Sequence, residues 1–128
     1  MIAAGALQTA IYAALNGVIS AAVYDAVPSG SASPYVVIGE TTDAPWDTMT
    51  DEGSQETVTL HVWSRASGYL EVKNLMQEVD AVLHNAILPL TGATMVNMQR
   101  EFMGTFSDLD LGVLWRRGEM RYRVWISQ

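Results

Sequence analysis

The chain has 128 residues, no cysteine and a formal net charge of −7 at pH 7. This length suits one domain, and the lack of cysteine excludes disulfides and thiolate metal sites. Residues 1–64 hold seven Asp and Glu and no Lys or Arg, whereas residues 65–128 hold seven of each sign. Such a balance argues against binding a phosphate backbone, which requires clustered Lys and Arg. Apolar runs end well before the ~18 residues of a membrane span, so we expect a soluble protein with no membrane partner.

The first half predicts one helix and two short strands. Residues 3–16 carry apolar side chains at helical spacing and end at Asn16-Gly17, a pair typical of helix C-termini. The expected buried stripe of this helix is Leu7, Ile11, Ala14, Leu15 and Val18. A short strand is expected at 23–25, a loop at 27–34 and a β-branched strand at 35–42. The acidic stretch 43–54 is predicted to be a long exposed loop or an open hairpin connection.

The second half predicts a strand, a helix and two more strands. Residues 55–65 alternate with a period of two, and those facing away from the core are Thr57, Thr59, His61, Trp63 and Arg65. A helix follows, capped by Ser67 or Gly68 and stopped by Pro89. Its expected buried stripe is Val72, Leu75, Met76, Val79, Val82, Leu83, Ala86 and Ile87. The last strands are expected at 94–106, with a bulge near Gly104, and at 112–127, with an interruption near Gly118.

These elements predict an α+β fold over residues 1–128 as one domain. A single antiparallel or mixed sheet packs against a long amphipathic helix, with the N-terminal helix beside it.

The sequence contains no recognisable motif for catalysis, metal binding or phosphate binding. His61 and His84 lie on different elements and lack the spacing of metal ligands. The acidic stretches DTMTDEG and SDLDLG depart from the calcium-loop pattern, and neither a GxSxG nucleophile motif nor a phosphate-binding loop occurs. We therefore expect no catalytic residues, no metal, no cofactor and no enzymatic activity.

Tryptophan and arginine recur on the strand positions that face away from the core. Arg121, Arg123 and Trp125 alternate with apolar residues, as Trp63 and Arg65 do on the earlier strand. Two interpretations stay open. The residues form either a solvent face on which arginines lie over tryptophan rings, or an interface, because Trp and Arg commonly anchor protein contacts.

Several stretches resemble the tail completion or tail terminator proteins of long-tailed phages and gene transfer agents. They are VYDAVPSGSASPYVVIGETTDAPWDT, then GSQETVTLHVWSRASGYLEVKNLMQEVDAVLH, and the closing RRGEMRYRV. Together they extend from about Ala3 to Ile126. The segment SDLDLGVLWRRG departs from the pattern, since the family often has a shorter Asp-x-Asp-Gly turn there.

The resemblance implies a structural virion protein that is assembled in the host cytoplasm, with no cofactor. It would form a ring, typically a homohexamer, at the head-proximal end of the tail tube. There it would stop tail elongation and join the tail to the head connector, while DNA passes through the lumen without specific binding. Its partners would be copies of itself, the tail tube protein and the connector. The alternatives are a head-side connector or stopper at the portal, and a small-molecule-binding or hydrolytic domain with the Trp46 loop as a lid.

Candidate contact residues fall into two groups. The first is expected to reach an axial neighbour, unless Trp46 folds back on its own sheet: Trp46, Asp47, Thr48, Asp51 and Glu52. The second is expected to make subunit or partner contacts: His61, Trp63, Arg65, Arg116, Arg117, Arg121, Arg123 and Trp125.

Overall fold

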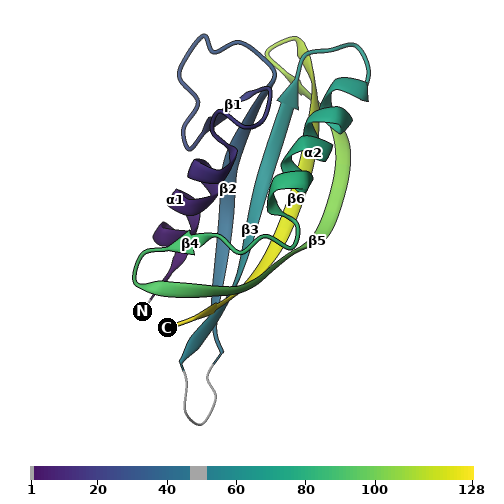
Figure 1. Cartoon of the computed structure of the whole chain (residues 1–128). Coiled ribbons are helices and arrows are strands. Elements are labelled where there is room, and N and C mark those ends of the chain that lie inside the picture. Colours follow the sequence, from purple (N-terminus) through teal and green to yellow (C-terminus); the bar gives the residue numbers. More distant parts are fainter. Residues whose placement is uncertain (1, 47–51) are drawn as a thin grey trace.

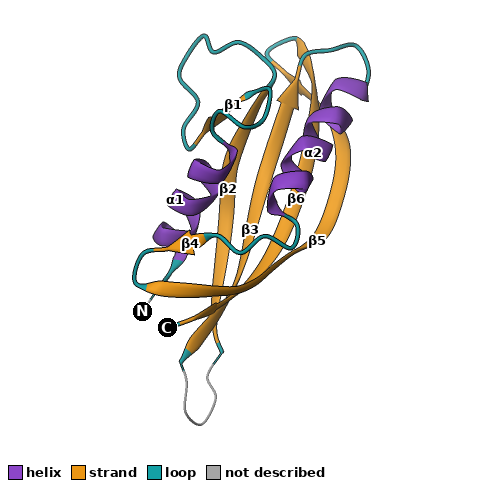
Figure 2. Cartoon of the chain, in the orientation of Figure 1, coloured by secondary structure: helices purple, strands orange, loops and turns teal. Residues whose placement is uncertain are grey.

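The computed structural model describes residues 2–46 and 52–128, which form two helices and a six-stranded mixed sheet (Figure 1). The elements are α1 (Ala4–Leu15), β1 (Ala22–Tyr24), β2 (Tyr35–Pro45), β3 (Gly53–Ser64), α2 (Leu70–Leu83), β4 (Pro89–Leu90), β5 (Ala93–Asp110) and β6 (Val113–Ser127). The strand order is β1-β2-β3-β6-β5-β4; β1 runs parallel to β2, and all other pairings are antiparallel. Both helices lie on the same face of the sheet (Figure 2). An α+β fold with a mixed sheet is thereby confirmed.

Helix α1 packs on the β1–β2 side of the sheet. Leu7, Ile11 and Leu15 are fully buried, as the spacing of four residues predicts. Val18 is exposed, contrary to expectation, because the helix ends at Leu15 and the chain turns at Gly17, whose φ is +79°. Neither helix of the described chain is long and apolar enough to cross a membrane.

Helix α2 is shorter than predicted at both ends. It starts after Tyr69, and no side chain caps it, so the expected cap at Ser67 or Gly68 is wrong. It ends at Leu83 because Asn85 adopts the left-handed conformation (φ 62°) and donates its amide hydrogen to the carbonyl of Met98 in β5. Ile87, predicted on the buried stripe, therefore lies beyond the helix and is exposed.

A chain of two hydrogen bonds fixes α2 on the sheet. The hydroxyl of Tyr122, a fully buried residue of β6, donates to Asp80 Oδ1 at 2.8 Å. The other oxygen of Asp80 accepts from Arg100 of β5, also at 2.8 Å. Burial, followed by the bond to Asp80, raises the pKa of Tyr122. One α2 carboxylate thus ties together the helix and two neighbouring strands.

The acidic stretch 43–54 begins and ends in strand. β2 continues to Pro45 and β3 begins at Gly53, where the amide of Trp46 donates to the carbonyl of Gly53 at 2.8 Å. The register is continuous from Thr41 to Pro45 after an irregularity between Ile38 and Thr41. Of the two predictions for 43–54, a loop over the whole stretch is wrong, whereas a hairpin connection agrees with the paired strand ends. The strands extend because backbone pairing overrides the polar composition.

Strands β5 and β6 form the longest pairing. The register of β5 shifts between Met95 and Asn97 and again between Arg100 and Phe102, so the bulge predicted at Gly104 is misplaced. β6 is continuous through Gly118, contrary to the expected interruption. A Cβ atom at Gly118 would lie 2.5 Å from Met76 Sδ, so this glycine makes room for α2 and does not break the strand.

Candidate functional site

The helix-free face of the sheet carries most of the predicted contact residues. On β3 it presents Thr57, Thr59, His61 and Trp63; on β6, Trp115, Arg117, Glu119, Arg121, Arg123 and Trp125; on β5, Phe102, Phe106 and Asp108. The register places Trp63 opposite Arg117, and Phe106 on the other side of Arg117. Side chains of one row come from three strands, so the face is a continuous surface of aromatic and charged groups.

An aromatic row crosses one end of this face. Ring centroids lie 5.8 Å apart for Tyr24 and Tyr35, 5.9 Å for Tyr35 and Trp115, and 5.8 Å for Trp115 and Trp63, all edge to face. The guanidinium of Arg65 lies 4.5 Å from the Trp115 ring centroid. Sequence reasoning missed Tyr35 and Trp115, although Trp115 shares the parity of the predicted Arg121 and Arg123 along β6.

A hollow of about 330 Å³ opens beside this row. Three rings, those of Tyr35, Trp63 and Trp115, line it together with the carboxyl groups of Asp108 and Asp110. Aromatic faces with nearby carboxylates favour a cationic or amphipathic contact group. The hollow makes this end of the face the part best suited to hold a partner side chain.

Trp125 does not join that row. It lies opposite Gln55, whereas Trp63 lies opposite Arg117, eight residues earlier on β6. At about 3.3 Å per residue, the two tryptophans are about 26 Å apart along the strand direction. The two tryptophans therefore belong to opposite ends of the face, and no single small contact could use both.

The arginines of the face already have acidic partners in the chain. Arg117 Nε bonds to Asp108 at 2.7 Å, Arg123 to Glu101 at 2.6 Å, and Arg121 lies 3.9 Å from the same Glu101 carboxylate. The pairs of Arg121 and Arg123 are solvent-accessible and contribute little to stability. They do orient the guanidinium groups. Among residues 2–46 and 52–128, Arg65 makes no ion pair, and its guanidinium lies over the Trp115 ring.

Arg116 belongs to the other face. Its guanidinium donates to Ser107 Oγ at 2.7 Å and to the carbonyl of Ser67 at 2.8 Å, and it lies 4.9 Å from the Tyr69 ring centroid. These contacts join the β5–β6 hairpin to the start of α2. Arg116 and Arg117, both predicted contact residues, therefore point to opposite faces of the sheet.

His61 is held by β2. Its Nε2 lies 3.0 Å from Glu40 Oε2, and this hydrogen bond is the main reason why the pKa of Glu40 is lowered. A Cβ atom at Gly39 would lie 2.8 Å from the His61 ring, so glycine is required for this approach. The exposed Glu40 carboxylate and the partly buried imidazole form one polar pair on the helix-free face.

The Trp46 group lies at the far end of the molecule. Trp46 is 42% exposed, and its ring atom Cε3 lies 3.0 Å from the Cβ position of Gly53, so the side chain lies partly against its own hairpin. Glu52 is exposed, and its carbonyl accepts the amide of Gln128 at 3.0 Å. Asp47, Thr48 and Asp51 lie outside the described residues.

The side chains gathered on the helix-free face are of the kinds that make contacts with other proteins. Among the described residues, no group of three or more His, Cys, Asp or Glu is placed to hold a metal ion. Tryptophan, tyrosine and arginine side chains on a sheet face are the residue types that anchor protein interfaces. The arrangement therefore suits binding between macromolecules.

The chain matches one family almost from end to end. The family model described as tail completion protein gp17 matches residues 3–127. A solved chain from the virion of a native gene transfer agent particle is 28% identical, with a TM-score of 0.87 over 98% of both chains. No curated protein matches the chain.

Proposed function

Because the chain belongs to the tail completion protein gp17 family, we propose that it forms a ring at the head-proximal end of a tail tube and stops tail elongation there. The family is one of structural virion proteins and not of enzymes, so the chain is a component of a virion tail. The proposal adds the ring, its position, the termination of the tail and the joining of the tail to the head connector.

The observation that carries the proposal is the structural match. A TM-score of 0.87 over 98% of both chains means that the two proteins share one fold over nearly their whole lengths. The solved chain belongs to the virion of a gene transfer agent particle. A protein of the same shape and length suits an equivalent place in a particle.

The mechanism is geometric. A closed ring requires two different patches on each subunit, because each copy contacts its neighbours through unlike surfaces. One side of the ring would match the last ring of the tube, and the other side would offer no surface for further tube subunits. A modest contact repeated around a ring becomes stable through high effective concentration. Elongation then stops without any chemical step.

Acidic side chains suit a channel for DNA. Glu40, Asp43 and Glu52 are exposed in the described chain, and like charge keeps phosphates from binding to a channel wall. Glu56, which the sequence would group with them, is fully buried and faces the helices. We assign to the lumen only Asp43 and Glu52, because Glu40 pairs with His61 on the helix-free face.

The helix-free face is assigned to contacts between subunits or with the connector. We expect Trp63→Ala combined with Arg65→Ala to leave the monomer folded by circular dichroism but absent from purified tails. A matched control removes one large apolar group and one cation from α2: Leu70→Ala with Lys73→Ala. If the Trp63 and Arg65 variant enters tails as well as the control does, the helix-free face is not the interface.

A further inference from the structure

The β5–β6 hairpin ends in an arm with an apolar tip. The pairing of β3 with β6 stops at Ser64 and Arg116, so residues 108–115 pair only with each other. Leu109 lies opposite Leu114, and the two are 74% and 48% exposed. Leu111, in the turn, is 96% exposed. We call Leu109, Leu111 and Leu114 the leucine arm.

Local folding does not explain Leu111. It occupies a two-residue turn with Gly112, and their φ angles are +49° and +78°. Such hairpin turns favour Asn-Gly, because a branched side chain is strained at positive φ. Leucine at this position is therefore unfavourable in two ways: its backbone has a positive φ, and its apolar side chain is exposed to water. A leucine that is unfavourable in both respects indicates a contact outside the monomer.

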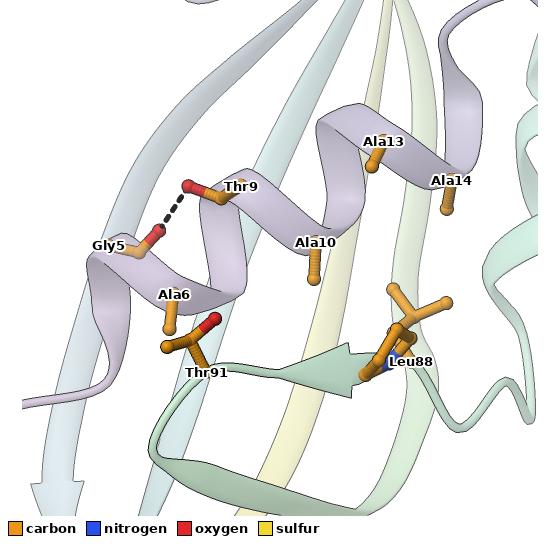
Figure 3. Close-up of a pocket in the computed structure, with 9 residues that line it drawn as sticks. Gly5, Ala6, Thr9, Ala10, Ala13, Ala14, Leu88 and Thr91 are labelled. Carbon is orange, nitrogen blue, oxygen red and sulfur yellow. Dashed lines mark hydrogen bonds between the residues drawn. The ribbon is translucent and has the colours of Figure 1, made fainter.

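An apolar groove lies near the other end of the molecule, between α1 and β4 (Figure 3). Its volume is about 670 Å³, and its walls include Ala6, Ala10, Ala13 and Ala14 of α1 with Leu88 and Pro89. The hydroxyl of Thr9, also in the wall, donates to the Gly5 carbonyl at 3.0 Å and so is satisfied within the helix. We call this feature the α1–β4 groove.

The outer surface of α1 lacks the charges of an ordinary solvent-facing helix. Its sequence, AGALQTAIYAAL, contains no charged residue. Exposed helix faces normally carry charged and polar side chains. A neutral wall of small residues is suited to receive a bulky apolar group, and the volume is within the range of ~300–1,000 Å³ that is common for binding pockets.

We propose that the leucine arm of one copy docks in the α1–β4 groove of a second copy. The arm cannot fill its own groove, because the β5–β6 turn and β4 lie at opposite ends of the molecule (Figure 1). A protruding apolar group and a complementary pocket elsewhere on the same chain produce a head-to-tail contact, which closes into a ring when the rotation allows it. The inference rests on the proposed ring and names its subunit contact.

The first test separates the monomer from the contact. Leu111→Asn gives the turn its preferred Asn-Gly sequence, so we expect a higher midpoint of thermal unfolding for the purified chain. Burial of a leucine accounts for a factor of about 10 in affinity or more, so the variant should be outcompeted at least about tenfold by the wild-type chain when both are coexpressed in particle-producing cells. Leu70→Asn removes another exposed leucine (72%), this one from α2, and serves as the control. Equal incorporation of Leu111→Asn and the wild type would overturn the proposal.

The second test identifies the occupant of the groove. Since the chain has no cysteine, a variant with both Leu111→Cys and Ala13→Cys can form a disulfide only between these positions or between like positions. Oxidised tails should yield a ladder of oligomers on a non-reducing gel, ending in a closed species. The control variant combines Leu70→Cys with Ala13→Cys.

One result is decisive against the contact, and a different one against the proposed function. A ladder no stronger than the control overturns docking in a second copy, even if Leu111→Asn is excluded from tails, because the arm then binds another protein. In that case the proposed ring is not contradicted if native mass spectrometry of the tails detects oligomers of this chain. Absence of the wild-type chain from tails would instead contradict the proposed function.

Discussion

Glu56 is a carboxyl group on the apolar side of the sheet. It is fully buried in β3, opposite Asp43 of β2, and neither of its oxygens receives a hydrogen bond from a donor group. Burial, followed by the nearby Asp43 carboxyl, raises the pKa of Glu56 to about 7 from 4.5. Below that pH, a protonated Glu56 can donate a hydrogen bond to Asp43. The pair is therefore stable with one proton and strained without it.

Glu56 should make stability fall as pH rises. A carboxyl whose pKa is raised on folding binds its proton more tightly in the folded state, so its favourable contribution is complete below pH 4.5 and is lost as pH rises through 7. The shift corresponds to about 3 kcal/mol of unfolding free energy. We expect Glu56→Gln, which keeps a donor at all pH values, to be about 1–3 kcal/mol more stable than the wild type at pH 8 and similar to it at pH 4.5. Urea unfolding at the two pH values measures this; a difference that does not change with pH would contradict the assignment.

The sequence predicts single residues well where one pattern decides their position. Strict alternation placed His61, Trp63, Arg121 and Trp125 away from the core, as the structure has them. It could not predict the partners of these residues, because the pairing of β6 with both β3 and β5 is set by long-range contacts. The role of Trp115 in the aromatic row cannot be predicted for this reason, since its neighbours Tyr35 and Trp63 come from other strands.

At the scale of elements, Gly118 controls how closely α2 approaches the sheet. A Cβ atom there would lie 2.5 Å from Met76 Sδ and 3.1 Å from Val72 Cγ2, and both residues are buried. Overpacking of this kind typically costs ~1–3 kcal/mol. We expect Gly118→Ala to lose that amount of unfolding free energy, measured with urea. Gly68→Ala, with nothing within 4 Å of the added atom, should change it by less than ~0.5 kcal/mol; equal losses would show that the contact with α2 is not the cause.

Element boundaries were predicted less well than element types. Periodicity identified both helices, but α2 ends where Asn85 turns and bonds to Met98, a tertiary contact that is invisible in the helix sequence. The polar composition of 43–54 predicts either a long loop or a hairpin connection, and it cannot decide between them because strand pairing is not visible in composition. Charged residues at its end do not prevent a hairpin when both backbone edges are paired.

At the scale of the whole molecule, the curled sheet brings three surfaces to different parts of one chain. They are the helix-free face with its aromatic row, the leucine arm and the α1–β4 groove. The sequence indicated the first through tryptophan and arginine. It could not indicate the groove, because the small residues of α1 form a groove only when the fold places Leu88 and Pro89 beside them. Three unlike surfaces suit a subunit that contacts several neighbours in a particle.

Deletion of the gene from the genome that encodes the particle tests whether this chain stops tail elongation. Negative-stain electron microscopy would measure the length distribution of the tails. We expect overlong tails of irregular length that are not attached to heads, with normal tails restored by the wild-type gene. Tails of normal length beside unjoined, DNA-filled heads would contradict termination and assign the chain to the head-side connector. Intact, infectious particles would contradict any structural role.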